Sequence, residues 1–179
     1  MRTIPIEGPH NAFESLLQPH FEQRGPDVTE ENIQARCRGM TLMALSNSAG
    51  HLVLATGNKT ELAVGYSTIY GDAVGGFAPI KDVPKTLVWD LARWRNDAAV
   101  ERGEVAPIPE SSIDKPPSAE LRPDQVDTDS LPDYDQLDAI LIRYVEFDRS
   151  IDDIVAAGFD RETVVEVVQK VDSSEYKRR

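Results

Sequence analysis

TGNKTELAVGYSTIYGDAVGGFAPIKDVPK, residues 56–85, is the stretch that decides the fold of this chain. It follows the apolar run HLVLAT at 51–56, which is typical of a strand buried on both faces of a parallel sheet. Ligands of open α/β sheets bind beyond the carboxyl ends of the strands, where the next helix points its N–H groups at phosphates. The stretch therefore predicts a nucleotide site, with Thr56 at the strand end and Glu61 in the first turn of the following helix.

The second half of the stretch is a loop that leads into another helix. Gly71-Asp72 and Gly75-Gly76 interrupt regular structure, and glycine backbone can approach a ligand closely. Asp82-Val83-Pro84 is typical of a helix start, so Lys85 falls in the first turn of a helix that we expect to reach about Asn96. The helix dipole disfavours a cation at this end. Lys85 is therefore a candidate functional residue.

Composition and charge limit the classes of protein. The chain has 179 residues, 40% of them hydrophobic and 28% charged, which predicts one folded domain. Its 19 Lys and Arg against 31 Asp and Glu give a net charge of -12, so neither nucleic acid nor a membrane surface is an expected partner. No apolar run reaches the roughly 20 residues of a membrane span. Without a signal peptide at its N-terminus, and with Cys37 as a lone cysteine that we expect to be buried, the chain indicates a cytoplasmic protein.

Helical periodicity precedes the apolar run. We expect an edge strand at Arg2–Ile6, a helix at Asn11–Phe21, and a second helix that Thr29 caps. On that second helix Asn32, Arg36 and Gly39 share one stripe at spacings i, i+4 and i+7. Spacing alone favours a solvated face for this stripe.

The segment 101–135 differs from the rest of the chain. It holds ten acidic residues against three basic ones and six of the twelve prolines, which is typical of a mobile loop or lid. Its centre, KPPSAELRP, places two cations and the hydroxyl of Ser118 where a lid would cover phosphates. Beyond it we expect helices at Tyr134–Phe147, after Ser150 and after Asp160, and a solvated basic tail.

Five motifs in this order carry a resemblance to a known family: TGNKTELAVGY, YGD, PIKDVPKT, KPPSAELRPDQVDTDSLPDYDQLDAIL and EYKRR. They resemble the synthetase domain of bacterial glutamine-dependent NAD synthetase, in which a nitrilase-like glutaminase precedes the synthetase. The resemblance implies an α/β architecture: an incomplete Rossmann-like adenine-nucleotide alpha-hydrolase fold, dominated by helices, with one or two parallel strands. Residues 1–179 match the C-terminal portion of that domain, since the SGGxDS phosphate loop and the glutaminase do not occur in this sequence.

The resemblance also implies an activity and its ligands. Members of the family adenylate the nicotinate carboxylate of deamido-NAD with ATP and release pyrophosphate, after which ammonia displaces AMP to give NAD. Cations and Mg²⁺ would neutralise the phosphate charge, and a lid would exclude water from the acyl-adenylate. The positions that match ATP contacts are Thr56, Lys85 and Ser118. Those that match deamido-NAD contacts are Asn32, Arg36, Glu61 and Lys177, and Glu61 also matches a Mg²⁺ ligand.

The sequence differs from the family pattern in two ways, and two other functions remain open. Ammonia-dependent members carry a lysine and an aspartate where this chain has Ile69 and Gly76, so those dinucleotide contacts do not carry over. Because the phosphate loop is missing, we expect the chain alone to be inactive, and no residue is assigned as catalytic. The alternatives are a non-catalytic dimerisation or assembly module of the same protein, and a related ATP pyrophosphatase acting on another carboxylate or carbonyl. We expect the chain to form homo-oligomers.

Overall fold

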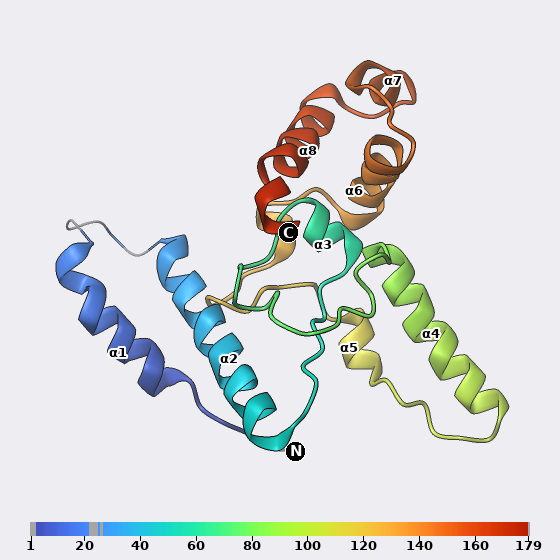
Figure 1. Ribbon diagram of the computed structural model, residues 1–179. Coiled ribbons are helices and arrows are strands. Elements are labelled where there is room, and N and C mark those ends of the chain that lie inside the picture. The colour runs from blue at the N-terminus through green and yellow to red at the C-terminus, as the bar shows by residue number, and fades with distance from the viewer. Residues whose placement is uncertain (1–2, 22–24, 26, 179) are drawn as a thin grey trace. The chain divides into compact units, whose positions relative to one another are not determined.

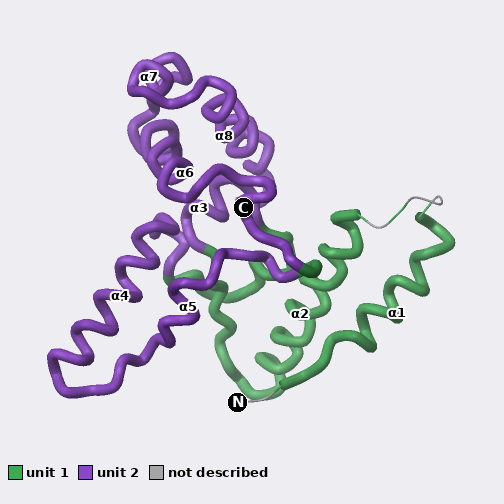
Figure 2. The backbone as a smooth tube through the Cα atoms, turned by 180° about the vertical axis from the view of Figure 1, so that it is seen from behind, with its two compact units in different colours: residues 1–57, 67–79, 121–123 green, residues 58–66, 80–120, 124–179 purple. Residues whose placement is uncertain are grey.

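The computed structural model describes residues 3–21, 25 and 27–178, and Figure 1 shows their secondary structure. Two compact units make up the chain, coloured separately in Figure 2. Unit 1 comprises residues 1–57, 67–79 and 121–123, and unit 2 comprises 58–66, 80–120 and 124–179. Each unit is built from segments that are distant in sequence, because the chain passes from one to the other several times.

Two helices dominate unit 1. α1 spans Glu7–Leu17 and continues into the 3-10 turn η1, Gln18–His20, whereas α2 spans Val28–Ala49. The N-cap of α2 is Asp27, not Thr29, because its side chain accepts a hydrogen bond from the Thr29 N–H at 2.7 Å. Its partner in a capping box is Glu30, whose carboxylate accepts from the Asp27 N–H at 2.8 Å.

The expected strand at 51–56 is reduced to one isolated parallel bridge, which joins Leu54 and Phe77. Two backbone bonds hold it, from Ala55 N to Phe77 O and from Gly76 N to Val53 O, both at 2.9 Å. Among the described residues no other strand pairing occurs, so the parallel strands are not confirmed. Leu54 remains exposed, whereas a strand inside a sheet would bury it on both faces.

The expected edge strand at the N-terminus is wrong in its described part. Residues 3–6 form no regular element, and Arg2 lies outside the described residues. α1 begins at Glu7 instead, with Gly8 and Pro9 in its first turn. Proline is tolerated there because the first helical N–H groups have no partner inside the helix.

Unit 2 holds short helical elements and two longer helices. Its N-terminal elements are α3 at Lys59–Ala63, α4 at Lys85–Glu101, α5 at Glu110–Asp114 and η2 at Asp127–Asp129. Its C-terminal elements are α6 at Tyr134–Leu141, a π-helical turn at Ile142–Glu146, α7 at Ile151–Ala156, α8 at Arg161–Ser173 and η4 at Glu175–Arg178. The Ser150 and Asp160 caps are confirmed, since each side chain accepts a backbone N–H of its helix.

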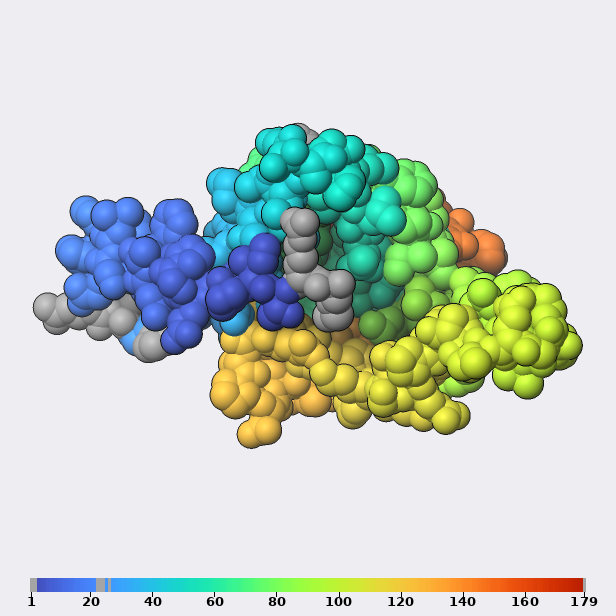
Figure 3. Space-filling model, turned by 90° about the horizontal axis from the view of Figure 1, so that it is seen from below, coloured from blue at the N-terminus to red at the C-terminus, as the bar shows by residue number. Residues whose placement is uncertain are grey.

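The hydrophobic core of unit 2 lies between α6, α7 and α8. Leu137, Ile140, Ile154, Val164 and Val167 are completely buried in it. They recur at helical spacing on α6 and α8, which is why these helices pack through one face. By contrast, the turn between α4 and α5 extends from this unit, and Figure 3 shows it in yellow-green at the surface. In the described part of the chain, no helix has the length and apolar character that crossing a membrane requires.

Candidate functional site

Lys85 is held in the first turn of α4 by a carboxylate from α3. Its ammonium lies 3.2 Å from Oε1 of Glu61, and the two side chains are only 17% and 21% exposed. The second oxygen of Glu61 accepts the N–H of Asn58 at 3.2 Å, while Asn58 Oδ1 accepts the Glu61 N–H at 2.9 Å. This reciprocal capping box fixes Glu61 at the start of α3 and so fixes the partner of Lys85.

Two aromatic rings complete the surroundings of the Lys85 ammonium. It lies 5.7 Å from the ring centroid of Trp89 and 5.4 Å from that of Tyr134, both within the range of cation–π attraction. The two rings meet edge to face at 5.7 Å. Lys85 is therefore a positioned and partly desolvated cation, at the helix end where cations are disfavoured.

Tyr134 is in turn fixed by a buried carboxylate. Its hydroxyl donates to Asp127 Oδ2 at 2.6 Å, and the other oxygen of Asp127 has no hydrogen-bond partner although it is buried. Burial raises the pKa of Tyr134, and the hydrogen bond to Asp127 raises that pKa further. The tyrosine thus stays neutral and keeps its ring in one orientation beside Lys85.

A second buried carboxylate, Asp138, ties α3, α4 and α6 together. Its Oδ1 accepts the hydroxyl of Thr60, and its Oδ2 accepts the N–H and hydroxyl of Thr86 at 2.9 and 2.8 Å. The Thr60 hydroxyl also accepts the Lys85 N–H at 2.9 Å. Asp138 therefore accepts from donors of Thr86 at the start of α4 and of Thr60 in α3, and so anchors the helical turn that carries Lys85.

In unit 1, the α2 stripe predicted from its spacing packs against the loop 67–72. The Thr68 hydroxyl donates to Asn32 Oδ1 at 2.8 Å, and Arg36 Nε donates to the carbonyl of Ile69 at 3.2 Å. Gly39 lies against the backbone of this loop, where a Cβ would come within 2.6 Å of the Tyr70 carbonyl oxygen. The solvated face that spacing alone favours is thus wrong for Asn32 and Gly39, whereas Arg36 remains exposed.

The basic tail closes the C-terminal end of α3. Lys177 Nζ donates to the carbonyl of Gly65 at 2.6 Å, and Arg178 donates to the carbonyl of Ala63 at 2.7 Å. Ser174 adds a hydrogen bond from its hydroxyl to the Val64 carbonyl at 3.1 Å. Hydrogen bonds to carbonyls at the C-terminal end of α3, where cations are favoured, therefore hold the described tail in place. The expectation of a solvated tail is wrong for these residues. Arg179 lies outside the described residues.

The remaining predicted ligand residues take part in fewer contacts. Thr56 is exposed and follows the Leu54 bridge in unit 1. Ser118 lies in unit 2, where its hydroxyl oxygen accepts the Glu120 N–H at 3.0 Å. Of the predicted residues, the structure directly joins Glu61 with Lys85, and it joins Asn32 and Arg36 to the same loop.

Glu61 is the one predicted metal ligand. Within the described ranges no three His, Cys, Asp or Glu side chains gather in a way that could hold a metal ion. One carboxylate suits Mg²⁺ that arrives with a nucleotide, since phosphate oxygens and waters then supply the remaining ligands. Lys85 already neutralises this carboxylate, so a metal ion there would have to displace the ammonium.

Sequence patterns alone did not identify the residues that position Lys85, which are Trp89, Tyr134, Asp127, Asp138, Thr60 and Thr86. A signal existed for Asp138, which lies between Leu137 and Ile140 on the apolar face of its helix. A carboxylate on such a face is buried only when it is fully hydrogen-bonded. Cys37 is buried as expected, and burial raises its pKa.

Comparison with known proteins shows the family of this chain. The NAD synthase family model matches residues 1–179. Glutamine-dependent NAD(+) synthetase of Acinetobacter baylyi is 59% identical over 169 residues, which are 94% of this chain and 30% of that protein. The protein of the same name from Rhodobacter capsulatus is 54% identical over 181 residues, covering 98% of this chain and 32% of its own.

Solved structures agree in fold. Glutamine-dependent NAD+ synthetase from Acinetobacter baumannii, in complex with ADP, superposes with a TM-score of 0.58 at 50% identity, covering 97% of this chain and 30% of that one. NMN synthetase from Francisella tularensis has a TM-score of 0.77 at 24% identity, which is a likeness in fold alone.

The fold is thus helix-rich and similar to that of NAD synthetase domains. This chain belongs to the NAD synthase family, as the five motifs in its sequence indicate. It spans about a third of the length of the relatives it matches.

Proposed function

We propose that this chain supplies part of the site in which a longer glutamine-dependent NAD synthetase adenylates deamido-NAD with ATP and amidates it to NAD. The observation that carries this proposal is the half-buried Lys85, held between Glu61, Trp89 and Tyr134 at the start of α4. A lysine at the end of a helix where the N–H groups also point outward provides, together with them, a favourable place for an added anion. The triphosphate of ATP is such an anion.

The ion pair suggests how the site accepts a magnesium nucleotide. If a triphosphate binds, the Lys85 ammonium would contact a phosphate oxygen in place of the Glu61 carboxylate, and that carboxylate could serve as one ligand of Mg²⁺. The Mg²⁺ would keep its phosphate oxygens and exchange a water for the carboxylate. By the family resemblance, Thr56 and Ser118 are the other positions that would contact ATP in the longer protein.

By the family resemblance, Asn32, Arg36 and Lys177 are the further positions that would contact deamido-NAD in the longer protein. The guanidinium Nη atoms of Arg36 make no hydrogen bond with any described residue, so they can meet a phosphate or carboxylate. Asn32 and Lys177 now hold protein groups, which orders the loop 67–72 and the tail before a ligand arrives. Ammonia would come from a glutaminase domain, as the full-length relatives' names imply.

Nucleotide binding tests the role of Lys85 directly. Titration calorimetry of the 179-residue chain with Mg·ATP should show that Lys85→Gln binds roughly tenfold or more weakly, because a charge-assisted phosphate contact is lost. Lys81→Gln is the matched control, since Lys81 is exposed in the same unit. Equal binding by the two variants would refute the proposal.

Activity of the isolated chain gives a second test. The SGGxDS loop that cradles phosphates in the family does not occur in these 179 residues, so we expect no ATP-dependent amidation of deamido-NAD when ammonia is supplied. Formation of NAD by the purified chain would show that the described residues form a complete site.

An assembly role is the second candidate. Leu87, Leu91 and Trp94 are exposed and share one stripe of α4, which is typical of a surface covered by another chain. Light scattering should then show self-association that Trp94→Lys abolishes, whereas Trp94→Phe preserves it. A monomer at all concentrations would remove this candidate.

A further inference from the structure

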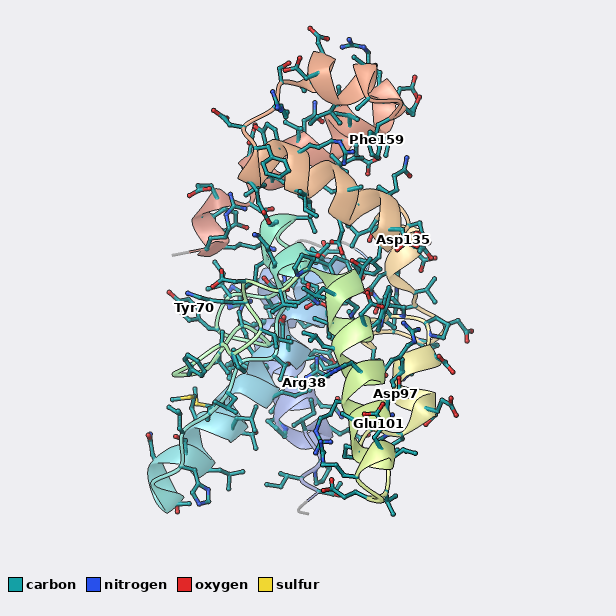
Figure 4. The ribbon with its side chains drawn as sticks, turned by 90° about the vertical axis from the view of Figure 1, so that its right-hand side faces the viewer. Arg38, Tyr70, Asp97, Glu101, Asp135 and Phe159 are labelled. Atoms are coloured by element: carbon teal, nitrogen blue, oxygen red, sulfur yellow. The ribbon has the colours of Figure 1, made fainter. Side chains whose placement is uncertain are left out.

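Tyr70 has an unusual backbone and an unusual exposure. Its φ of 64° lies in the left-handed region, which a bulky L residue rarely adopts. Its side chain is nevertheless 78% exposed and lies at the outer edge of its loop (Figure 4). Packing of the ring therefore does not explain why a tyrosine occupies this position.

The neighbouring residues force this conformation on the loop. The Thr68 N–H donates to Asp72 Oδ1 at 2.7 Å, and the Gly71 N–H donates to the Thr68 carbonyl at 3.0 Å. Together with the bonds of Thr68 to Asn32 and of Ile69 to Arg36, these contacts hold the loop on both sides of Tyr70. Strained backbone persists only where its surroundings determine it in this way, and such sites are commonly functional.

Two glycines make the close approach of loop and helix possible. A Cβ on Gly39 would come within 2.6 Å of the Tyr70 carbonyl oxygen, and one on Gly71 would come within 2.9 Å of the Ala35 Cβ. The loop backbone is thus pressed against α2, and the Tyr70 side chain is left to project from it. Gly39 on the helix and Gly71 on the loop both allow this close approach, and the Tyr70 ring stays exposed.

The chemistry around the ring indicates its ligand. Ile69, next to Tyr70, carries the carbonyl that accepts from Arg36, so a guanidinium with uncommitted Nη donors lies beside the loop. A flat aromatic surface near such a cation suits a ligand that has both an aromatic ring and a phosphate or carboxylate. The tyrosine hydroxyl has no hydrogen-bond partner among the described residues, so it does not fix the side chain to the protein.

We propose that Tyr70 is a ligand-binding residue, whose ring stacks on an aromatic ring of the dinucleotide while Arg36 contacts the adjoining anionic group. This proposal rests on the proposed function and adds to it a contact for one ring, nicotinate or adenine. The loop fixes the backbone of Tyr70, so only the freedom of its side chain is lost when the ligand binds.

The test compares three variants of the full 179-residue chain. Tyr70→Gly removes the ring and suits a positive φ, so its thermal midpoint should not fall. Its affinity for deamido-NAD in titration calorimetry should nevertheless fall roughly tenfold to a hundredfold, which is the usual effect of losing one stacked base. Tyr70→Phe keeps the ring and should bind like the wild type. Phe147→Gly, at an exposed aromatic residue that is not among the proposed ligand contacts, is the control and should also bind like the wild type.

Titrations with nicotinate mononucleotide and with AMP identify the stacked ring, since only the fragment that carries it should bind more weakly to Tyr70→Gly. Unchanged affinity of Tyr70→Gly for deamido-NAD overturns the role of Tyr70 and leaves the proposed function standing. Failure of the wild type to bind deamido-NAD overturns the role of Tyr70 in this chain, whereas the proposed function is decided separately by the Mg·ATP titration of Lys85→Gln. Loss of binding in Tyr70→Phe as well would exclude stacking, because the ring is still present.

Discussion

The ammonium of Lys85 and the carboxylate of Glu61 lie 3.2 Å apart, with both side chains largely buried. Neither residue depends on this contact alone. Glu61 also closes the capping box of α3 through Asn58, and Lys85 lies beside the rings of Trp89 and Tyr134. Both side chains are therefore held in place in unit 2 by additional contacts, and a bound nucleotide would meet them in this arrangement.

A double-mutant cycle should measure the strength of this pair. We expect a coupling free energy between Lys85→Met and Glu61→Gln of roughly 1 kcal/mol in urea unfolding, above that of typical exposed pairs, because both partners are partly desolvated. The same cycle with Lys81→Met in place of Lys85→Met should give no coupling, since Lys81 is exposed. Similar values in both cycles would mean that the ion pair adds no specific stability.

Removal of the Asp138 carboxylate should destabilise unit 2 strongly. Asp138→Ala leaves the hydroxyls of Thr60 and Thr86 and one N–H without their acceptor, which should cost about 3 kcal/mol of unfolding free energy. Asp138→Asn retains one oxygen acceptor and should cost less. Asp135→Asn, on the exposed side of the same helix, should change the unfolding free energy by less than about 0.5 kcal/mol. A mild Asp138→Ala variant would show that α4 does not need this anchor.

Stability should fall at alkaline pH because of Tyr134. Its pKa is raised in the folded protein by burial and by Asp127, whereas an unfolded tyrosine ionises near pH ~10. Above that pH the unfolded state binds fewer protons than the folded state, so the unfolding free energy decreases by about 1.4 kcal/mol per pH unit. Below it, the contribution of Tyr134 is fully present.

Tyr134→Phe separates this effect from others. The variant should lose about 1–3 kcal/mol at neutral pH, because Asp127 Oδ2 loses its donor, but its stability should fall less steeply in alkali. The slope should decrease without vanishing, since the pKa of Tyr144 is also raised. Urea unfolding across the alkaline range measures both quantities. An unchanged slope would assign the alkaline loss to other groups.

Gly65 should tolerate no side chain. Its φ is 67°, and an added Cβ would overlap the side chain of Ser174, which anchors the tail to α3. Gly103 has a φ of 74° but open space around it, so Gly103→Ala reports the backbone effect alone, about 1 kcal/mol. Gly65→Ala should cost at least about 1 kcal/mol more than that, and Ser174→Gly in the same chain should restore part of the loss. Equal losses at the two glycines would show that the tail moves aside.

Local patterns in the sequence determined much of the helical structure. Apolar residues at helical spacing and capping residues predicted α8 after Asp160 and α7 after Ser150, since both signals act within a few residues of the chain. Lys85 in the first turn of α4 was also predictable, because Pro84 marks the helix start. Resemblance through the five motifs identified the family.

Only the tertiary structure decided which side chains meet. Lys85 lies beside Glu61, Trp89 and Tyr134. Asn32 and Arg36 of α2 form hydrogen bonds with the loop that contains Tyr70. Apart from Trp89, which lies one turn along α4 from Lys85, these partners are far apart in the chain, so no local pattern specifies their contact. The strand predicted at 51–56 does not form for the same reason. Its apolar residues are suited to a sheet, but a strand forms only where another strand pairs with it. Here the pairing is limited to one bridge, between Leu54 and Phe77.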